Sequence, residues 1–180
     1  GHRLRQRRSG RLDQSGSDTL TINSSGLLDL NGNDESVGHL IFNGGRTASG
    51  ELRFVGSDEV TVNANAQTAT IGSSMFLDGV NNDFVVADGA AAIDLNITGS
   101  INAGTINKTG AGTMQLTNTA DFTAVINVNE GTLLLANPST SAIQGTLSIG
   151  DGIGAPGADV ARLLANNQLA DNAFAVSVQS

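Results

Sequence analysis

Several residue types that often mark a site or a core are missing from this chain. Its 180 residues include no cysteine, tryptophan or tyrosine and only two prolines. Without cysteine there is no disulfide, thiolate metal site or cysteine nucleophile. The apolar runs are far shorter than the roughly 18 residues that a membrane-spanning helix needs. Because aromatic residues make up only 3%, the core has to be built from aliphatic side chains and six phenylalanines.

Positive charge is scarce outside one short segment. Five of the nine basic residues lie at the start of the chain, namely Arg3, Arg5, Arg7, Arg8 and Arg11. All 17 acidic residues follow them, so we expect the rest of the chain to repel nucleic acid. The sequence predicts a basic tail, residues 1–12, and a single domain, residues 13–180. The tail is either a solvated extension or a contact for an anionic partner, such as lipopolysaccharide or the acidic domain of another copy.

The chain is rich in short β-type segments separated by turn residues. The run Ile106–Asn137 holds three of them in succession: Thr113–Leu116, Val125–Val128 and Thr132–Leu135. The others are Thr19–Asn23, Leu27–Leu30, His39–Phe42, Glu51–Val55, Glu59–Val62, Thr68–Ile71, Met75–Leu77, Phe84–Ala87, Ala92–Ile97, Gly104–Asn107, Gly145–Ile149 and Phe174–Val178. Their regular spacing predicts an all-β sandwich, barrel or solenoid.

Three features favour a β-solenoid. Tight hairpin signals are scarce, and the small aliphatic residues suit a narrow interior. Asparagine, which tolerates a left-handed backbone, recurs after the β-type segments and predicts coil corners. These asparagines are Asn23, Asn31, Asn43, Asn63, Asn107 and Asn129. One stretch, Ala158–Gln168, has helical spacing of its apolar residues, so we predict one short helix near the C-terminus.

The two ends of the chain share a pattern. Val176–Ser180 matches Leu20–Ser24, 156 residues earlier, and Arg162-Leu163 parallels Arg11-Leu12. Neither end has an obvious cap, so the chain is either a fragment of a longer array or a unit that stacks head to tail. The candidate self-association residues are Arg3, Arg5, Arg7, Arg8, Arg11, Leu20, Ile22, Phe174, Val176 and Val178.

Two segments of the opening run carry a family resemblance. They are Ile106–Leu116 (INKTGAGTMQL) and Val128–Leu135 (VNEGTLLL), with further similarity at Ser25–Gly32 and Ile149–Leu164. They resemble the autotransporter-associated β-strand repeat of bacterial surface-protein passenger regions, although Phe122 stands where that family often has tyrosine. The resemblance implies a right-handed parallel β-helix on a cell surface, and it does not imply an enzyme.

Two motifs have the spacing of ligand sites. Gly152–Gly157 fits the G-x-G-x-x-G pattern of a dinucleotide turn, but the chain lacks the alternation of strands and helices that such a site needs. Asp29–Glu35 resembles the start of a calcium loop, with Asp34 where that loop requires glycine. We therefore expect turns at both places, and no cofactor or metal.

Catalytic constellations are equally sparse. The pairs Asp34-Glu35 and Asp58-Glu59 put neighbouring carboxylates on opposite faces of a strand. The histidines, His2 and His39, form no triad or zinc spacing. We expect a non-catalytic, extracellular or cell-surface rod that binds other copies of itself head to tail, without membrane insertion. The alternatives are an adhesin fragment that binds surface polymers, glycans or host proteins, and a polysaccharide lyase or hydrolase.

Overall fold

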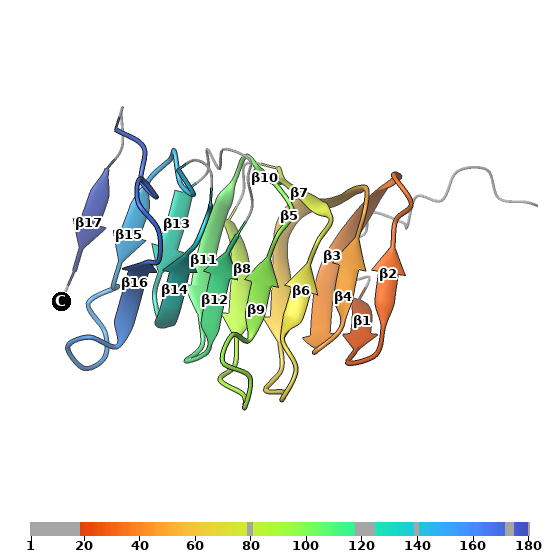
Figure 1. Ribbon diagram of the computed structural model, residues 1–180, viewed down its shortest axis with the longest axis horizontal. Coiled ribbons are helices and arrows are strands. Elements are labelled where there is room, and N and C mark those ends of the chain that lie inside the picture. The colour runs from red at the N-terminus through yellow and green to blue at the C-terminus, as the bar shows by residue number, and fades with distance from the viewer. Residues whose placement is uncertain (1–18, 79–80, 118–124, 139–140, 172–174, 180) are drawn as a thin grey trace, which may run out of the picture.

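The chain winds as a parallel β-solenoid, which confirms the predicted fold class. The computed structural model describes residues 19–78, 81–117, 125–138, 141–171 and 175–179. Within these ranges all regular elements are β-strands, and the strand pairs of both sheets run parallel. Figure 1 shows the strands stacked along one long axis, with β1 and β2 at one end and β16 and β17 at the other. The described part of the chain contains no helix long and apolar enough to cross a membrane.

Sheet A forms one side of the solenoid. Its main path consists of β1 (Thr19–Asn23), β3 (Asp34–Asn43), β5 (Glu51–Val62), β8 (Asn81–Val86), β11 (Thr105–Thr109), β13 (Val125–Val128), β15 (Leu147–Ile149) and β17 (Val176–Val178). Two short strands, β7 (Ser74–Leu77) and β10 (Ile101–Asn102), extend it beside the first half of β5. Four residues of β5 bulge out where Val37 pairs with Phe54 and His39 with Glu59.

Sheet B forms the opposite side. It consists of β2 (Leu27–Asp29), β4 (Arg46–Ala48), β6 (Ala69–Ile71), β9 (Leu95–Ile97), β12 (Thr113–Leu116), β14 (Gly131–Leu135) and β16 (Asp159–Leu163). The chain alternates between the main path of sheet A and sheet B, so each coil contributes one such strand to each side, and β7 and β10 are additional strands of sheet A. Side chains alternate between buried and half-buried along these strands, as β12 and β14 show, so one face of each sheet lines a shared core.

The inward side chains form straight columns along the axis. One column of sheet A runs through Leu20, Leu40, Val60, Phe84, Lys108, Val128, Ile149 and Val178. A column of sheet B runs through Leu28, Thr47, Ile71, Ile97, Leu116, Leu135 and Leu163. The sheet A column is apolar except for Lys108, whose exposed fraction is 0%.

Asparagines form hydrogen-bonded ladders on the outside of sheet A. Asn43 Nδ2 donates to Asn23 Oδ1, and Asn63 Nδ2 donates to Asn43 Oδ1, both at 2.8 Å. These residues lie where strands end, as expected for corners. Asn107 instead lies within β11, where its Nδ2 donates to Asp83 Oδ1 on the neighbouring strand β8 at 3.0 Å. The ladders connect residues that are 20 or 24 positions apart on neighbouring coils, and they hold these coils in register.

The predicted helix at Ala158–Gln168 is wrong. Asp159–Leu163 forms β16, and all five residues pair with Gly131–Leu135 of β14. A helix of this length is marginal by itself, whereas the edge of β14 offers a continuous row of backbone partners. The leucines that suggested an apolar helix face, Leu163 and Leu164, are both about half exposed.

Candidate functional site

Exposed apolar side chains concentrate at the two ends of the solenoid. The described residues include seven large exposed hydrophobic side chains. Five of them belong to the end strands or follow one directly: Leu27 on β2, Leu163 and Leu164 at β16, and Val176 and Val178 on β17. The exposed fractions of Val176 and Val178 are 48% and 74%. The C-terminal end is therefore the most apolar surface among the residues that the structure describes.

The same end carries an open backbone edge. Leu147 N donates to Ala175 O at 3.0 Å, and Gln179 N donates to Ile149 O at 2.8 Å. In a parallel pair, alternate residues direct their N–H and C=O groups to opposite sides of the strand. The backbone groups of Val176 and Val178 consequently point away from β15, toward the open edge. In the described part of the chain, no strand pairs with β17 on that side.

The N-terminal end presents the complementary set of backbone groups. Inward residues bond to the coil that follows them, since Phe42 O accepts from Asn63 N and Lys108 O accepts from Asn129 N, both at 2.9 Å. The outward residues Thr19 and Thr21 therefore direct their backbone groups to the side of β1 away from β3, where no strand of the described residues pairs with it. The C-terminal edge thus presents the backbone groups of inward-facing residues to an added strand, and the N-terminal edge presents those of outward-facing residues.

The structure also changes how the two ends align. The sequence pattern matches Val178 with Ile22, but the Cα pairing followed from coil to coil brings Val178 into the column of Leu20. Ser177 likewise lies in the outward column that begins at Thr19. The two alignments differ by two residues. Both therefore keep the same side chains facing inward, and only the strand pairing followed along the solenoid distinguishes them.

The predicted self-association residues lie at opposite ends of the molecule. Val176 and Val178 are exposed on β17, whereas on β1 Leu20 is half-buried and Ile22 is buried. Figure 1 shows that β1 and β17 lie at opposite ends of a single copy, which therefore does not bring them together. The other candidates, Arg3, Arg5, Arg7, Arg8, Arg11 and Phe174, lie outside the described residues.

Lys108 is the most unusual group of the interior. Its side chain points inward between Phe84 and Val128, and its Nζ reaches the corner between the sheets. There Nζ donates to the carbonyl oxygens of Gly110 and Glu130, both at 2.7 Å, and to that of Thr109 at 3.3 Å. Burial lowers the pKa of Lys108 to about 8, although the Glu130 carboxylate favours the charged form. Lys108 joins two successive coils, and we assign it a structural role.

Glycines let the two coils meet at this corner. Gly110 N donates to Glu130 Oε2 at 2.9 Å, and both Gly110 and Gly131 have positive φ angles, 76° and 74°. A Cβ atom on Gly131 would lie 2.6 Å from Gly110 O, a contact that the backbone cannot accommodate. The KTGAGT and NEGT segments thus interlock, which gives the motif a packing explanation without any catalytic group.

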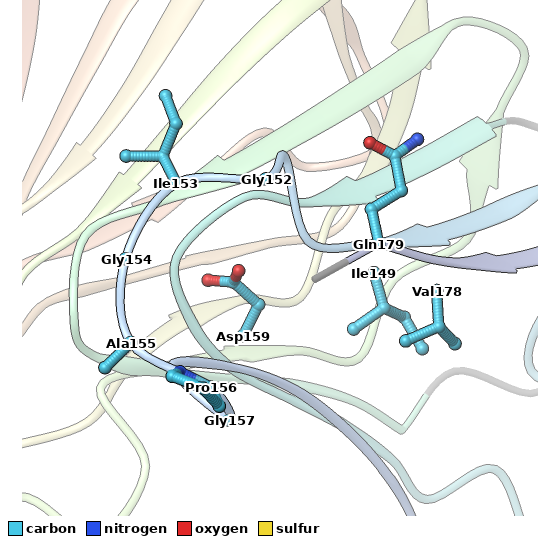
Figure 2. Close-up of a pocket in the computed structure, with 10 residues that line it drawn as sticks. All are labelled: Ile149, Gly152, Ile153, Gly154, Ala155, Pro156, Gly157, Asp159, Val178 and Gln179. Carbon is cyan, nitrogen blue, oxygen red and sulfur yellow. The ribbon is translucent and has the colours of Figure 1, made fainter.

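The loop that follows β15 lines a cavity near the C-terminal end of the solenoid. Gly152–Gly157 curves around Asp159 and, with Ile149, Val178 and Gln179, lines a volume of about 240 Å³. Figure 2 shows the Asp159 carboxylate within the space that the loop encircles. Burial, followed by the negative charges of Asp151 and Glu130, raises the pKa of Asp159. The glycine pattern leads into strand β16 and not into a helix, so the loop lacks the helix N-terminus of a dinucleotide site.

The remaining motif residues do not converge on a site. Asp29 Oδ1 accepts from Asn31 N at 2.9 Å, so the calcium-like segment closes its own turn. Asp58 points inward and Glu59 outward, where Glu59 pairs with His39 at 3.1 Å. Burial raises the pKa of Asp58, whose Oδ2 has no hydrogen-bond partner. Across residues 19–171 as far as they are described, and 175–179, no cluster of three His, Asp or Glu residues is placed to hold a metal.

Comparison of the chain with protein-family models, curated proteins and solved structures gives no match. The resemblance to the autotransporter-associated repeat therefore stays a prediction, and it depends on the motif residues around Lys108.

Proposed function

We propose that this chain is a non-catalytic structural module of a bacterial extracellular or cell-surface protein, a β-solenoid rod whose copies stack head to tail into filaments. The observation that carries the proposal is the end of sheet A, where β17 combines an open parallel edge with two exposed valines. An open strand edge with an apolar face readily adds another strand. A contact between two different surfaces that does not close on itself generates a filament.

The extracellular and bacterial parts of the proposal depend on the motif resemblance. Its residues, Lys108–Thr113 and Asn129–Leu135, form one interlocked corner between two coils. A motif that serves stacking is what a rod-forming repeat requires. Protease treatment of intact cells that produce the protein tests this part. Protein on the cell surface should be digested, whereas protein inside the cells would stay intact.

The expected affinity of stacking is modest. Covering the exposed parts of Val176, Val178 and Leu163 contributes about 1 kcal/mol each by the usual area scale. New strand hydrogen bonds add about 1 kcal/mol each. A micromolar dissociation constant needs about 8 kcal/mol, which is more than these contributions add up to, so we expect assembly only well above micromolar concentrations.

Sedimentation velocity and negative-stain electron microscopy of the purified chain test the proposal. The native chain should form end-to-end rods whose length increases with protein concentration. Val178→Lys should reduce them to short single rods, because the new charge lies on the stacking surface. Val55→Lys is the matched control, since Val55 is also exposed but lies in the β5 bulge on the side of the rod. Short single rods of the native chain at several hundred micromolar in physiological salt would overturn the proposal.

A further inference from the structure

We infer that the second copy lays its β1 on β17 of the first copy in one register, with Thr19 opposite Ser177 and Leu20 over Val178. This inference rests on the proposed stacking, and it adds the pairing of the two copies. The partner is a second copy because the two ends of this chain offer matching strands, faces and backbone groups.

The backbone groups of the two edges match in this register. Val178 directs its N–H and C=O groups outward from β17, and Thr19 and Thr21 direct theirs outward from β1. With Leu20 as its Cα partner, Val178 bonds to the residues on either side of Leu20, which are Thr19 and Thr21. This is the same pattern by which Ile149 O accepts from Gln179 N one coil earlier.

The side chains continue the columns already present. Leu20 of the second copy extends the apolar sheet A column that ends at Val178 of the first copy, and Leu20 in turn pairs with Leu40 of its own chain. Outside, Ser177 Oγ donates to Ser148 Oγ at 3.0 Å, and the Thr19 hydroxyl of the second copy extends that polar column. The joint therefore resembles an ordinary step between coils of one chain.

The register suggested by the sequence pattern alone, with Ile22 over Val178, fits less well. It slides the second copy along the strands by two residues, about 6.6 Å. Every step of the sheet A column within the chain keeps its residues in line, including the step across the β5 bulge.

Disulfide trapping tests the register, and the absence of native cysteine makes the readout unambiguous. Protein with Thr19→Cys is mixed with protein carrying Ser177→Cys and a larger affinity tag, then oxidised mildly. Directly opposed residues on neighbouring strands have Cα atoms about 4.8 Å apart, within disulfide range. The matched control replaces Thr19→Cys by Thr21→Cys, which in the inferred register lies about 8 Å from residue 177 and is too far to bridge.

We expect a mixed cross-linked dimer, identified by mass spectrometry, with Thr19→Cys and at least tenfold less with Thr21→Cys. Preferential cross-linking through Thr21→Cys would overturn the inferred register and leave head-to-tail stacking intact. Rods of native length without either cross-link would overturn this joint as well. If the native chain stays in single rods and neither pair cross-links, the proposed function itself fails.

Discussion

Lys108 is the only lysine of the chain, and its complete burial makes the alkaline pH dependence of stability a direct test of the corner that it occupies. Burial lowers its pKa from 10.5 to about 8. The chain has no cysteine or tyrosine, so no other side chain titrates between about pH 8 and 11. A change in the free energy of unfolding between pH 8 and 11 therefore arises from Lys108, apart from any contribution of the terminal amine.

The direction of the effect follows from proton counting. Between the two pKa values the unfolded chain binds one proton more than the folded chain, so the free energy of unfolding rises with pH. The difference between 10.5 and about 8 corresponds to roughly 3 kcal/mol. Below about pH 8 both states carry the charge, and the contribution stays constant. The expected profile is flat near pH 7 and rises toward pH 11.

Urea unfolding followed by far-ultraviolet circular dichroism measures this profile, because the chain lacks tryptophan and tyrosine as fluorescent reporters. We would introduce Val178→Lys in all samples to suppress stacking; this lysine is exposed and cancels in the comparison. Lys108→Met should remove the rise, whereas Arg162→Met, at an exposed position, should keep it. If the profiles with and without Lys108 ran parallel from pH 7 to 11, the reasoning would be refuted. The three carbonyl acceptors would then hold the ammonium at its ordinary pKa.

Three further predictions concern other parts of the structure. Gly131→Ala should destabilise the fold by more than about 3 kcal/mol, because backbone strain and a clash with Gly110 O add up. Gly152→Ala, with a similar φ but no atom within 4 Å, should cost only about 1 kcal/mol, and equal losses would contradict the interlocked corner. Asp58→Asn should raise stability at pH 7 by about 1 kcal/mol and leave it unchanged at pH 3. Because the pKa of Asp58 is raised in the folded chain, the free energy of unfolding of the native chain falls as pH rises above the pKa of this carboxyl in the unfolded chain. A variant that is less stable than the native chain at pH 7 would contradict this reasoning. Deletion of residues 1–11 should weaken stacking, more strongly at low salt, and unchanged rods would exclude a role for these residues.

Local patterns were sufficient to predict most strands of the solenoid. Thr113–Leu116 and Val125–Val128 match β12 and β13 residue for residue, because each is a short alternating segment between turn residues. The prediction failed at Asp159–Leu163, where a preceding strand edge decides the structure. Pairing with β14 depends on residues 28 positions away, and local spacing carries no information about it.

The role of Lys108 was also missed from the sequence. The sequence identifies Lys108 only as part of the Ile106–Leu116 segment that carries the family resemblance. The alternation of β11 contains the signal, since Lys108 lies two residues after the buried Ile106 and so shares its face. What the sequence alone does not give is the set of acceptors, because two of them, the carbonyls of Gly110 and Glu130, converge only when consecutive coils stack.

The uneven coil lengths have a consequence for how such a rod changes over time. Hydrogen-bonded partners on neighbouring coils are 20 residues apart at Asn107 and Asn127 but 29 apart at Ser148 and Ser177. The extra residues all enter the connecting loops, while the strand ladders keep their pairing. Since each coil depends only on its neighbours, duplicating or deleting a whole coil changes the length of the rod by one strand spacing, about 4.8 Å. The architecture separates length, which is set by the number of coils, from surface chemistry, which the loops are free to vary.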